Sequence, residues 1–279
     1  MTSARVCGVE IVHWAPRRWR TRNVNALGRR VRNFGDLLGP WLVQRMLEEV
    51  SSQSSGGASS TVRASRPDTR LVTVGSIIRL TRDGDVVWGT GVNGKSKDLP
   101  FERRVLDIRS VRGPRTRAWL MSKGFVVPEI FGDPGLLTAR YAASIPAWEK
   151  SCNDVLVVPN LHDYVGFKKA YEAEFEVLNP QSPLEECIAR IRAANFVAGS
   201  SLHGVCLADA FGVPARLISP GTEPAFKYED YFLGTGRSVP RVARSVGEAL
   251  SYGGAPSPDF DAERLRAAFP YELWECEPG

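Results

Sequence analysis

The residues best equipped for chemistry lie in one stretch, residues 195–214, which reads NFVAGSSLHGVCLADAFGVP. Ser200, Ser201 and His203 follow a short apolar segment there, and His203 is one of only three histidines in the chain. A histidine can donate or accept a proton near neutral pH. Serine hydroxyls and the unpaired N–H groups at the start of a helix favour an anion. The stretch therefore predicts an anion-binding site with a proton-transfer group beside it.

The elements around these residues would hold them at the end of a strand. Residues 195–199 predict a buried strand, residues 200–204 a tight polar turn, and residues 205–211 a short helix. Gly212 and Pro214 end that helix, because glycine favours the end of a helix and proline forbids its continuation. Open α/β sheets bind ligands at the carboxyl ends of their strands, so we expect the histidine at such a site.

Strands and helices alternate along the rest of the chain, which predicts an α/β fold with parallel sheets covered by helices. The length of 279 residues favours two domains, and we expect two Rossmann-like halves facing a cleft. We place these halves at residues 1–145 and 146–279, with the final helices able to pack back on the first half. Strands are expected at residues 7–14, 70–74, 85–88, 105–111, 125–127, 154–158 and 215–219, and helices at 33–50, 114–123, 182–194, 226–233, 244–251 and 260–269.

The segment before residue 61 combines one of these helices with two irregular stretches. An arginine-rich connection runs up to Arg32. Asn33 then predicts the N-cap of the helix, and Asp36 stands where a capping-box partner would. Residues 51–60, SSQSSGGASS, have the low complexity of a flexible loop.

Composition sets the class of protein. Hydrophobic residues make up 43% of the chain and charged residues 24%, as in ordinary globular proteins. No apolar run is long enough for a membrane helix, and no signal-peptide pattern is visible. Five scattered cysteines without a CxxC pair predict reduced thiols, a cytoplasmic location and no metal site. The net charge of +5 indicates a solvated basic surface and leaves open a peripheral contact with the inner face of a membrane. No nucleic-acid-binding signature is present.

Residues 89–96, GTGVNGKS, match the phosphate-binding pattern GxxxxGK[ST] and contain GxGxxG. Both patterns need a strand before them and a helix directly after them. The strand is expected, but Pro100 falls where the second helical turn would lie. We therefore interpret the stretch as a glycine-rich loop that lets the backbone approach a ligand or a neighbouring strand.

Taken together, eight motifs between about residues 30 and 240 resemble the polysaccharide pyruvyl transferase family. In chain order they are NFGDLLGPWLVQRML, GSII after a strand, VVWGTGV, VRGPRTR, FGDPGLL, VVPNLHD, GSSLHGVCLADAFGVP and FKYEDYF. The resemblance implies a fold like that of two-domain GT-B glycosyltransferases. It also implies phosphoenolpyruvate as donor, no metal or organic cofactor, and a sugar residue of a cell-surface or exopolysaccharide precursor as acceptor. The product would be a cyclic pyruvate ketal, and the acceptor is either lipid-linked or a finished polymer.

The resemblance assigns the proton-transfer role to His203, within the family's SLHG element. Some family members carry a donor-binding arginine at the position of Ser201, and Lys227 is the basic residue expected to compensate. Phosphoenolpyruvate carries a carboxylate and a phosphate, which basic side chains and helix N-termini bind well. The residues expected to bind the donor are Arg112, Arg115, Ser200, Ser201 and Lys227, and those expected on the acceptor side are Asp36, Asn93 and His162.

Several alternatives remain open for these residues. Arg112 could instead pair with a carboxylate such as Asp107 or Asp133, Asp36 could be only a capping residue, and His162 could be a structural turn residue. Two other functions also fit the expected fold. One is a glycosyltransferase that uses a nucleotide sugar, and the other is a catalytically inactive glycan-binding protein.

Overall fold

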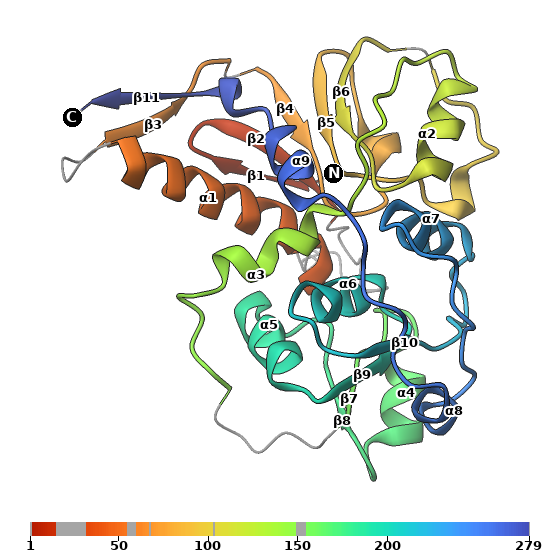
Figure 1. Cartoon of the computed structure of the whole chain (residues 1–279). Coiled ribbons are helices and arrows are strands. Elements are labelled where there is room, and N and C mark those ends of the chain that lie inside the picture. Colours follow the sequence, from red (N-terminus) through yellow and green to blue (C-terminus); the bar gives the residue numbers. More distant parts are fainter. Residues whose placement is uncertain are drawn as a thin grey trace, which may run out of the picture.

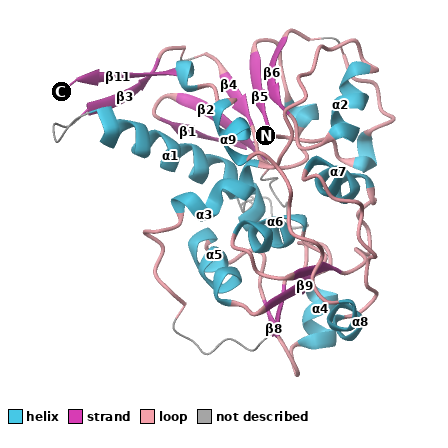
Figure 2. Ribbon diagram, viewed as in Figure 1, coloured by secondary structure: helices cyan, strands magenta, loops and turns pink. Residues whose placement is uncertain are grey.

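The computed structural model describes residues 2–14, 32–54, 60–66, 68–102, 104–148 and 155–278. The arginine-rich connection at residues 15–31 and residues 55–59 of the serine-rich stretch lie outside the described residues. Parallel sheets and helices alternate through the described chain, which confirms the predicted α/β class (Figures 1 and 2). The strands are β1 (Thr2–Val6), β2 (Val9–His13), β3 (Ser60–Ala64), β4 (Arg70–Val72), β5 (Asp85–Trp88), β6 (Leu106–Ser110), β7 (Val155–Val157), β8 (Glu176–Val177), β9 (Phe196–Gly199), β10 (Ala215–Leu217) and β11 (Trp274–Pro278).

The larger sheet is built mainly from the first half of the chain, in the order β1-β2-β4-β5-β6. β1 and β2 form an antiparallel hairpin, and the remaining neighbours are parallel. Cys7 and Gly8 make the hairpin turn, and both have positive φ values, as a type I′ turn requires. Apolar residues of β2, β4 and β5 fill the core against the helices, among them Ile11, Leu71 and Trp88, which are all fully buried.

The second sheet comes from the second half of the chain. Its order is β10-β9-β7-β8, and all of its neighbours are parallel. Short apolar strands such as β9, which reads FVAG, are typical of a parallel sheet covered by helices on both faces. The helices are α1 (Phe34–Ser54), α2 (Pro114–Met121), α3 (Thr138–Tyr141), α4 (Tyr164–Tyr171), α5 (Leu184–Ala193), α6 (Leu202–Ala210), α7 (Phe226–Gly234), α8 (Val246–Tyr252) and α9 (Ala262–Ala267).

Helix α1 connects the cores of the two sheets. In Figure 1 its N-terminal end lies beside α6 of the lower part, and from there it runs below the larger sheet toward β3. Leu42 and Met46 pack with the strands of the larger sheet, whereas Phe34 and Leu38 share a core with Leu202 of α6. The N-terminal turn of α1 is thereby fixed next to the first turn of α6, which matters for the site described below.

The final segment of the chain returns to the larger sheet. Figure 1 shows α9 and β11, in blue, beside elements of the first half. β11 pairs with β3 in an antiparallel two-stranded sheet. The indole Nε1 of Trp88 donates to the backbone oxygen of Leu265 at 2.9 Å, and Trp274 Nε1 donates to the oxygen of Val6 at 3.1 Å. Leu265 and Trp274 therefore belong to the core of the first half.

Three sequence expectations are corrected by the structure. The helix expected at residues 205–211 begins already at Leu202, because Ser201 caps it with a side-chain oxygen that accepts from Gly204 N. The strand expected at residues 125–127 is a loop, in which Val126 is 93% exposed. Residues 51–54 continue α1 and are not part of a loop.

A helix that crosses a bilayer needs about 20 mostly apolar residues. No helix in the described part of the chain is both long enough and apolar enough to do so.

Candidate functional site

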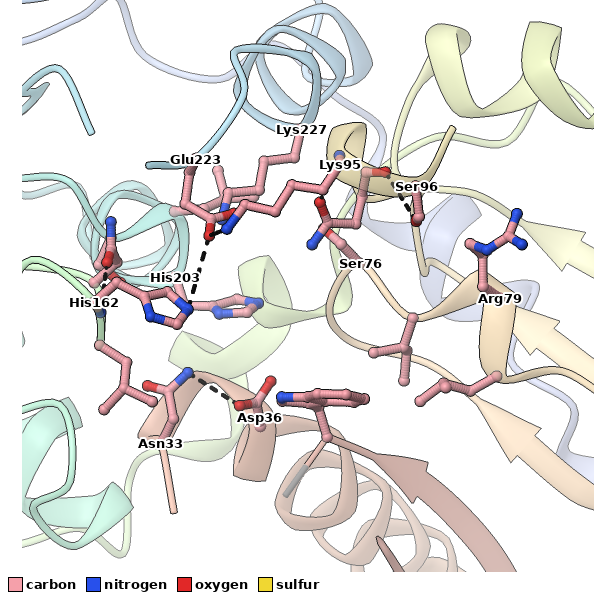
Figure 3. A pocket seen from close by; sticks show the side chains of 18 residues that line it. Asn33, Asp36, Ser76, Arg79, Lys95, Ser96, His162, His203, Glu223 and Lys227 are labelled. Carbon is pink, nitrogen blue, oxygen red and sulfur yellow. Dashed lines mark hydrogen bonds and ion pairs between the residues drawn. The ribbon is translucent and has the colours of Figure 1, made fainter. Parts of the chain in front are cut away.

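A cavity of about 360 Å³ lies where strand ends of both sheets meet. Trp14 follows β2, Ser76 follows β4 and Asn93 follows β5, while Asn160 follows β7 and Ser201 follows β9. All five line the cavity, which is the carboxyl-end position that α/β sheets use for ligands. Figure 3 shows further lining side chains, with Asp36, His203, Glu223 and Lys227 among them.

His203 lies in the first turn of α6 and reaches this cavity. A Cβ on Gly35 would come within 2.0 Å of His203 Nδ1, so the imidazole packs directly on the backbone of α1. His203 Nε2 is buried and has no hydrogen-bond partner in the described residues. Burial lowers the pKa of His203 to about 3, and the positive charges of Lys227 and Arg112 lower it further. The imidazole is therefore neutral near pH 7 and has one ring nitrogen available.

Asp36 lines the same cavity from the first turn of α1. Its Oδ2 accepts a hydrogen bond of 3.1 Å from Asn33 Nδ2. Burial raises the pKa of Asp36 to about 7, although this hydrogen bond and the charge of Lys227 act in the opposite direction. A carboxyl group with a pKa near 7 can both donate and accept protons at neutral pH. Asp36 thus combines the contact with Asn33 that the sequence predicts with a carboxyl pKa near neutral pH.

Two lysines that line the cavity share one carboxylate. Lys227 Nζ lies 2.8 Å from Glu223 Oε2, and Lys95 Nζ lies 2.5 Å from Glu223 Oε1. The side chain of Glu223 is only 6% exposed, and the two lysines lower its pKa against the opposing effect of burial. Burial lowers the pKa of Lys227, with the Glu223 charge acting against that change.

The structure brings several of the predicted site residues together. Ser201, Lys227 and His203 line the cavity, as do Asp36, Asn93 and His162 from the predicted acceptor side. Asn93 Oδ1 accepts from the backbone N of Lys95 at 3.0 Å, and His162 Nε2 lies 4.0 Å from Glu223 Oε1. Residues far apart in the sequence therefore converge on one cavity.

Three predicted donor-binding residues do not line the cavity. Arg112 is fully buried, where Nε donates to Asp230 Oδ2 at 3.2 Å and one terminal nitrogen donates to Ser76 Oγ at 2.7 Å. It reaches the cavity wall only through Ser76, which is a lining residue. The partner of Arg112 is thus Asp230, and neither of the two carboxylates suggested by the sequence fills that place.

Arg115 and Ser200 also lie away from the cavity lining. Arg115 forms an exposed ion pair with Glu229 at 2.5 Å. Ser200 Oγ accepts two hydrogen bonds of 3.1 Å from Asn160, one from its backbone and one from its side chain. Ser200 thereby positions the loop that carries His162, so its contact with the site is indirect.

Sequence reasoning missed Lys95 and Glu223 as site residues. Lys95 belongs to the stretch GTGVNGKS, where the structure has only a short 3-10 turn at Gly94–Ser96 and no following α-helix. This confirms that the stretch is not a phosphate-binding loop of the usual kind. Glu223 lies in an irregular loop, and no sequence pattern marks it. The one sequence signal that could have found either residue is the position of Lys95 in a glycine-rich loop.

The described residues contain no group of three or more histidine, cysteine, aspartate or glutamate side chains arranged to hold a metal ion. Cys187 and Cys206 are buried free thiols in the core. The side chains that line the cavity include two lysines, two histidines and two carboxylates, which are Lys95, Lys227, His162, His203, Asp36 and Glu223.

Comparison with known proteins gives a consistent result. The family model for polysaccharide pyruvyl transferases matches residues 74–222, more than half of the chain. The chain is also similar to the succinoglycan biosynthesis protein ExoV of Rhizobium meliloti (strain 1021), with 29% identity over 216 residues. That alignment covers 71% of this chain and 60% of the relative, so the chain spans less than two thirds of its relative's length. No solved structure matches the chain, and its likeness to GT-B enzymes stays a prediction.

Proposed function

Because the chain belongs to the polysaccharide pyruvyl transferase family, we propose that it transfers pyruvate from phosphoenolpyruvate to two hydroxyls of one sugar residue. The product would be a cyclic ketal on a precursor of an exopolysaccharide or cell-surface glycan, with phosphate released. The observation that carries this proposal is the cavity in which His203, Asp36 and two lysines meet. It offers cations for an anionic donor and two groups able to move protons.

The donor would bind on the side of the cavity formed by Lys227, Lys95 and Ser201. Ammonium groups form strong charge-assisted hydrogen bonds to phosphate and carboxylate oxygens. The first backbone N–H groups of α6 add a favourable electrostatic field for an anion. Because phosphoenolpyruvate carries its carboxylate and phosphate close together, this cluster of hydrogen-bond donors suits it better than it would suit a neutral sugar.

The reaction would proceed by one addition and one substitution at the central carbon of the donor. A proton added to the methylene carbon makes that carbon a methyl group and leaves an oxocarbenium-like centre. One sugar hydroxyl attacks this centre and loses its proton, and a second hydroxyl then displaces phosphate. The proton from one hydroxyl makes up for the proton that was added to the methylene carbon. The proton from the other hydroxyl leaves with phosphate. These polar steps need no metal or organic cofactor in the mechanism that we propose.

We assign the two proton transfers to His203 and Asp36. The neutral His203 would gain a proton when the donor is bound, because the negative charges of the donor oppose the effect of Lys227 on its pKa. His203 would then protonate the methylene carbon. Asp36 would accept the proton of the attacking hydroxyl, since its pKa of about 7 leaves much of it ionised at neutral pH.

The acceptor would enter from the side of Trp14, Asn93 and His162. Trp14 is 50% exposed at the cavity, and an aromatic face of this kind can stack on a sugar ring. Asn93 and His162 supply polar groups for sugar hydroxyls. We propose that the acceptor belongs to polysaccharide biosynthesis, in agreement with the printed name of the relative from Rhizobium.

The test is to incubate the chain with phosphoenolpyruvate and a panel of galactosyl, glucosyl and mannosyl acceptors. Released phosphate and the mass of a pyruvylated product are measured together, in wild type and His203→Ala. We expect both signals in wild type and their loss in the variant, while its thermal unfolding stays close to that of wild type. Phosphate release with no acceptor dependence, or no product with any acceptor, would contradict the proposal.

Thermal unfolding with added ligands tests the donor separately. A ligand that binds only the folded state raises the melting temperature. We expect phosphoenolpyruvate to raise it in wild type and to raise it less in Lys227→Ala. A rise with UDP and none with phosphoenolpyruvate would instead favour a glycosyltransferase that uses a nucleotide sugar.

A further inference from the structure

The carboxylate of Glu223 lies in the cavity between two lysines that also line it. Its two oxygens bind two different lysines, with Oε1 at 2.5 Å from Lys95 Nζ and Oε2 at 2.8 Å from Lys227 Nζ. His162 Nε2 lies 4.0 Å from Oε1. A carboxylate with two oxygens between two cations resembles one carboxylate or phosphate group of a bound substrate in charge and geometry.

The two lysines keep unused capacity for binding. An ammonium group has three N–H donors. In the part of the chain that the structure describes, Glu223 is the hydrogen-bond partner of each of these ammonium groups. Both Lys95 and Lys227 line the cavity, so their remaining donors are available to a ligand.

The segments that carry these groups differ in regularity, although the loop of Glu223 is itself anchored where Gly221 N donates to Asp163. Lys95 belongs to the 3-10 turn Gly94–Ser96, which Asn93 Oδ1 caps and which packs on Pro224 and Phe226. Lys227 lies on α7. Glu223 lies in the irregular loop between β10 and α7, so its side chain can turn away without breaking a strand or a helix. The cations are thus positioned by regular structure, and the anion between them is not.

We propose that Lys95 and Lys227 form a two-lysine anion clamp and that Glu223 holds the place of one anionic group of the substrate until the substrate displaces it. Lys95 then becomes a substrate-binding residue, and Glu223 becomes an internal competitor that keeps the lysines in position in the empty site. The identity of the substrate as phosphoenolpyruvate rests on the proposed function, whereas the clamp itself would bind any small phosphate or carboxylate.

Four variants test the clamp. Isothermal titration calorimetry measures the affinity of each variant for inorganic phosphate and for phosphoenolpyruvate. Glu223→Gln removes the competing charge and keeps the shape, so we expect phosphate to bind about tenfold more tightly than in wild type. Lys95→Gln should weaken binding about tenfold, and Lys95→Arg should restore most of it because the charge returns. Lys97→Gln is the matched control, since Lys97 is exposed, lies two residues away and does not line the cavity.

Glu223→Gln separates the clamp from a purely structural role. If Glu223 only orders the two lysines, its loss should weaken anion binding or leave it unchanged, and either result would overturn the proposal. Equal behaviour of Lys95→Gln and Lys97→Gln would overturn it as well. Thermal unfolding of each variant without ligand identifies any change that comes from misfolding, and Lys95→Arg keeps the test valid if Lys95→Gln is unstable.

Failure of the clamp can be distinguished from failure of the proposed function. If wild type makes a pyruvylated sugar and the variants leave the KM for phosphoenolpyruvate unchanged, the clamp is wrong and the function stands. If wild type makes no such product and Glu223→Gln still tightens phosphate binding, the clamp stands and the function is wrong.

Discussion

At the scale of single residues, Asp36 has the clearest link between structure and pH dependence. Its pKa of about 7 predicts that kcat/KM rises with pH through this value, because the ionised form is the one that accepts the hydroxyl proton. Asp36→Asn should lower the rate by a factor of about 10² to 10⁴ and abolish this rise. Initial rates measured across the pH range would check both effects.

The control for this prediction is stability. Asp36→Asn replaces a carboxylate that burial disfavours with a neutral amide of the same size. The variant should therefore unfold at the temperature of wild type or above it. A variant with normal turnover, or one whose lost activity follows lost folding, would remove Asp36 from the mechanism.

Asp133 predicts a pH effect on stability that is independent of catalysis. It is fully buried, its Oδ2 has no hydrogen-bond partner in the described residues, and burial raises its pKa from 3.8 to about 6. Below about pH 4 the group is protonated in both states. Between about pH 4 and 6 it ionises mainly in the unfolded chain, so stability falls as pH rises. Above about pH 6 the loss is complete, at about 3 kcal/mol.

Asp133→Asn should be free of this loss. Relative to wild type, the variant should become more stable as pH rises from about 4 to 7, while Gly135 N keeps an oxygen to bind. Urea unfolding at several pH values measures the difference in free energy of unfolding. Asp98→Asn, at an exposed carboxylate, should follow wild type throughout. A pH-independent difference between Asp133→Asn and wild type would show that Asp133 ionises equally in both states.

Single residues also show where sequence reasoning succeeds. His203 could be placed at the site because a polar turn after an apolar strand marks a strand end. Lys95 and Glu223 could not, since their roles depend on two loops that are 128 residues apart in the chain meeting at one cavity. Arg112 was expected to contact a ligand. The structure gives it a buried partner, Asp230 of α7, which no local pattern could reveal.

At the scale of elements, α2 and α7 are joined by one buried carboxylate. Asp230 of α7 accepts from the backbone N of Thr116 at 2.9 Å, from Thr116 Oγ1 at 2.6 Å and from Arg112 at 3.2 Å. Asp230→Ala would leave Arg112 buried without its counter-ion. We expect a loss of about 3 to 5 kcal/mol in the free energy of unfolding, measured by denaturant titration.

The neighbouring pair on the same two helices provides the control. Arg115 and Glu229 form an ion pair at the surface, with Arg115 43% exposed. Glu229→Ala should cost less than about 1 kcal/mol, because water screens the pair and replaces its contacts. Similar losses in both variants would mean that burial does not decide the strength of the connection between α2 and α7.

Most regular elements follow from local patterns, and the exceptions have identifiable causes. Strands such as β5 and β9 and helix α5 lie within a few residues of their expected bounds, because apolar runs and caps mark them. The hairpin β1–β2 was missed because its turn at Cys7 uses a positive φ that sequence does not announce. The expected strand at 125–127 fails because Val126 has no neighbouring strand and stays exposed.

At the scale of the whole molecule, the first half is completed by residues from the end of the described chain. Leu265 is fully buried in the core that contains Trp88. Leu265→Ala should lower the free energy of unfolding by about 2 to 5 kcal/mol, because it removes buried methyl groups and leaves a cavity. Leu250→Ala, at a 41% exposed position of α8, should change it by no more than about 0.5 kcal/mol. Equal effects would mean that α9 is only loosely attached.

The two-sheet architecture follows from the alternation of strands and helices, but the convergence of their strand ends does not. Composition and periodicity predict the strands and helices of each sheet, but not how the two sheets are placed relative to each other. The packing of α1 across both cores brings Asp36 next to His203, and that packing depends on residues more than a hundred positions apart. The site is therefore a property of the assembled chain.

The return of α9 and β11 to the larger sheet has a consequence for the order in which the protein is made. A ribosome synthesises the strands β2, β4 and β5 long before it reaches Leu265 and Trp274, which close their core. The first half must wait, with part of its apolar surface uncovered, until those residues leave the exit tunnel. The strands of the second sheet are complete by residue 217, and the last helix that fills its core is α8, which is made before Leu265. The half that is translated first is thus the half whose core is completed by the residues made last.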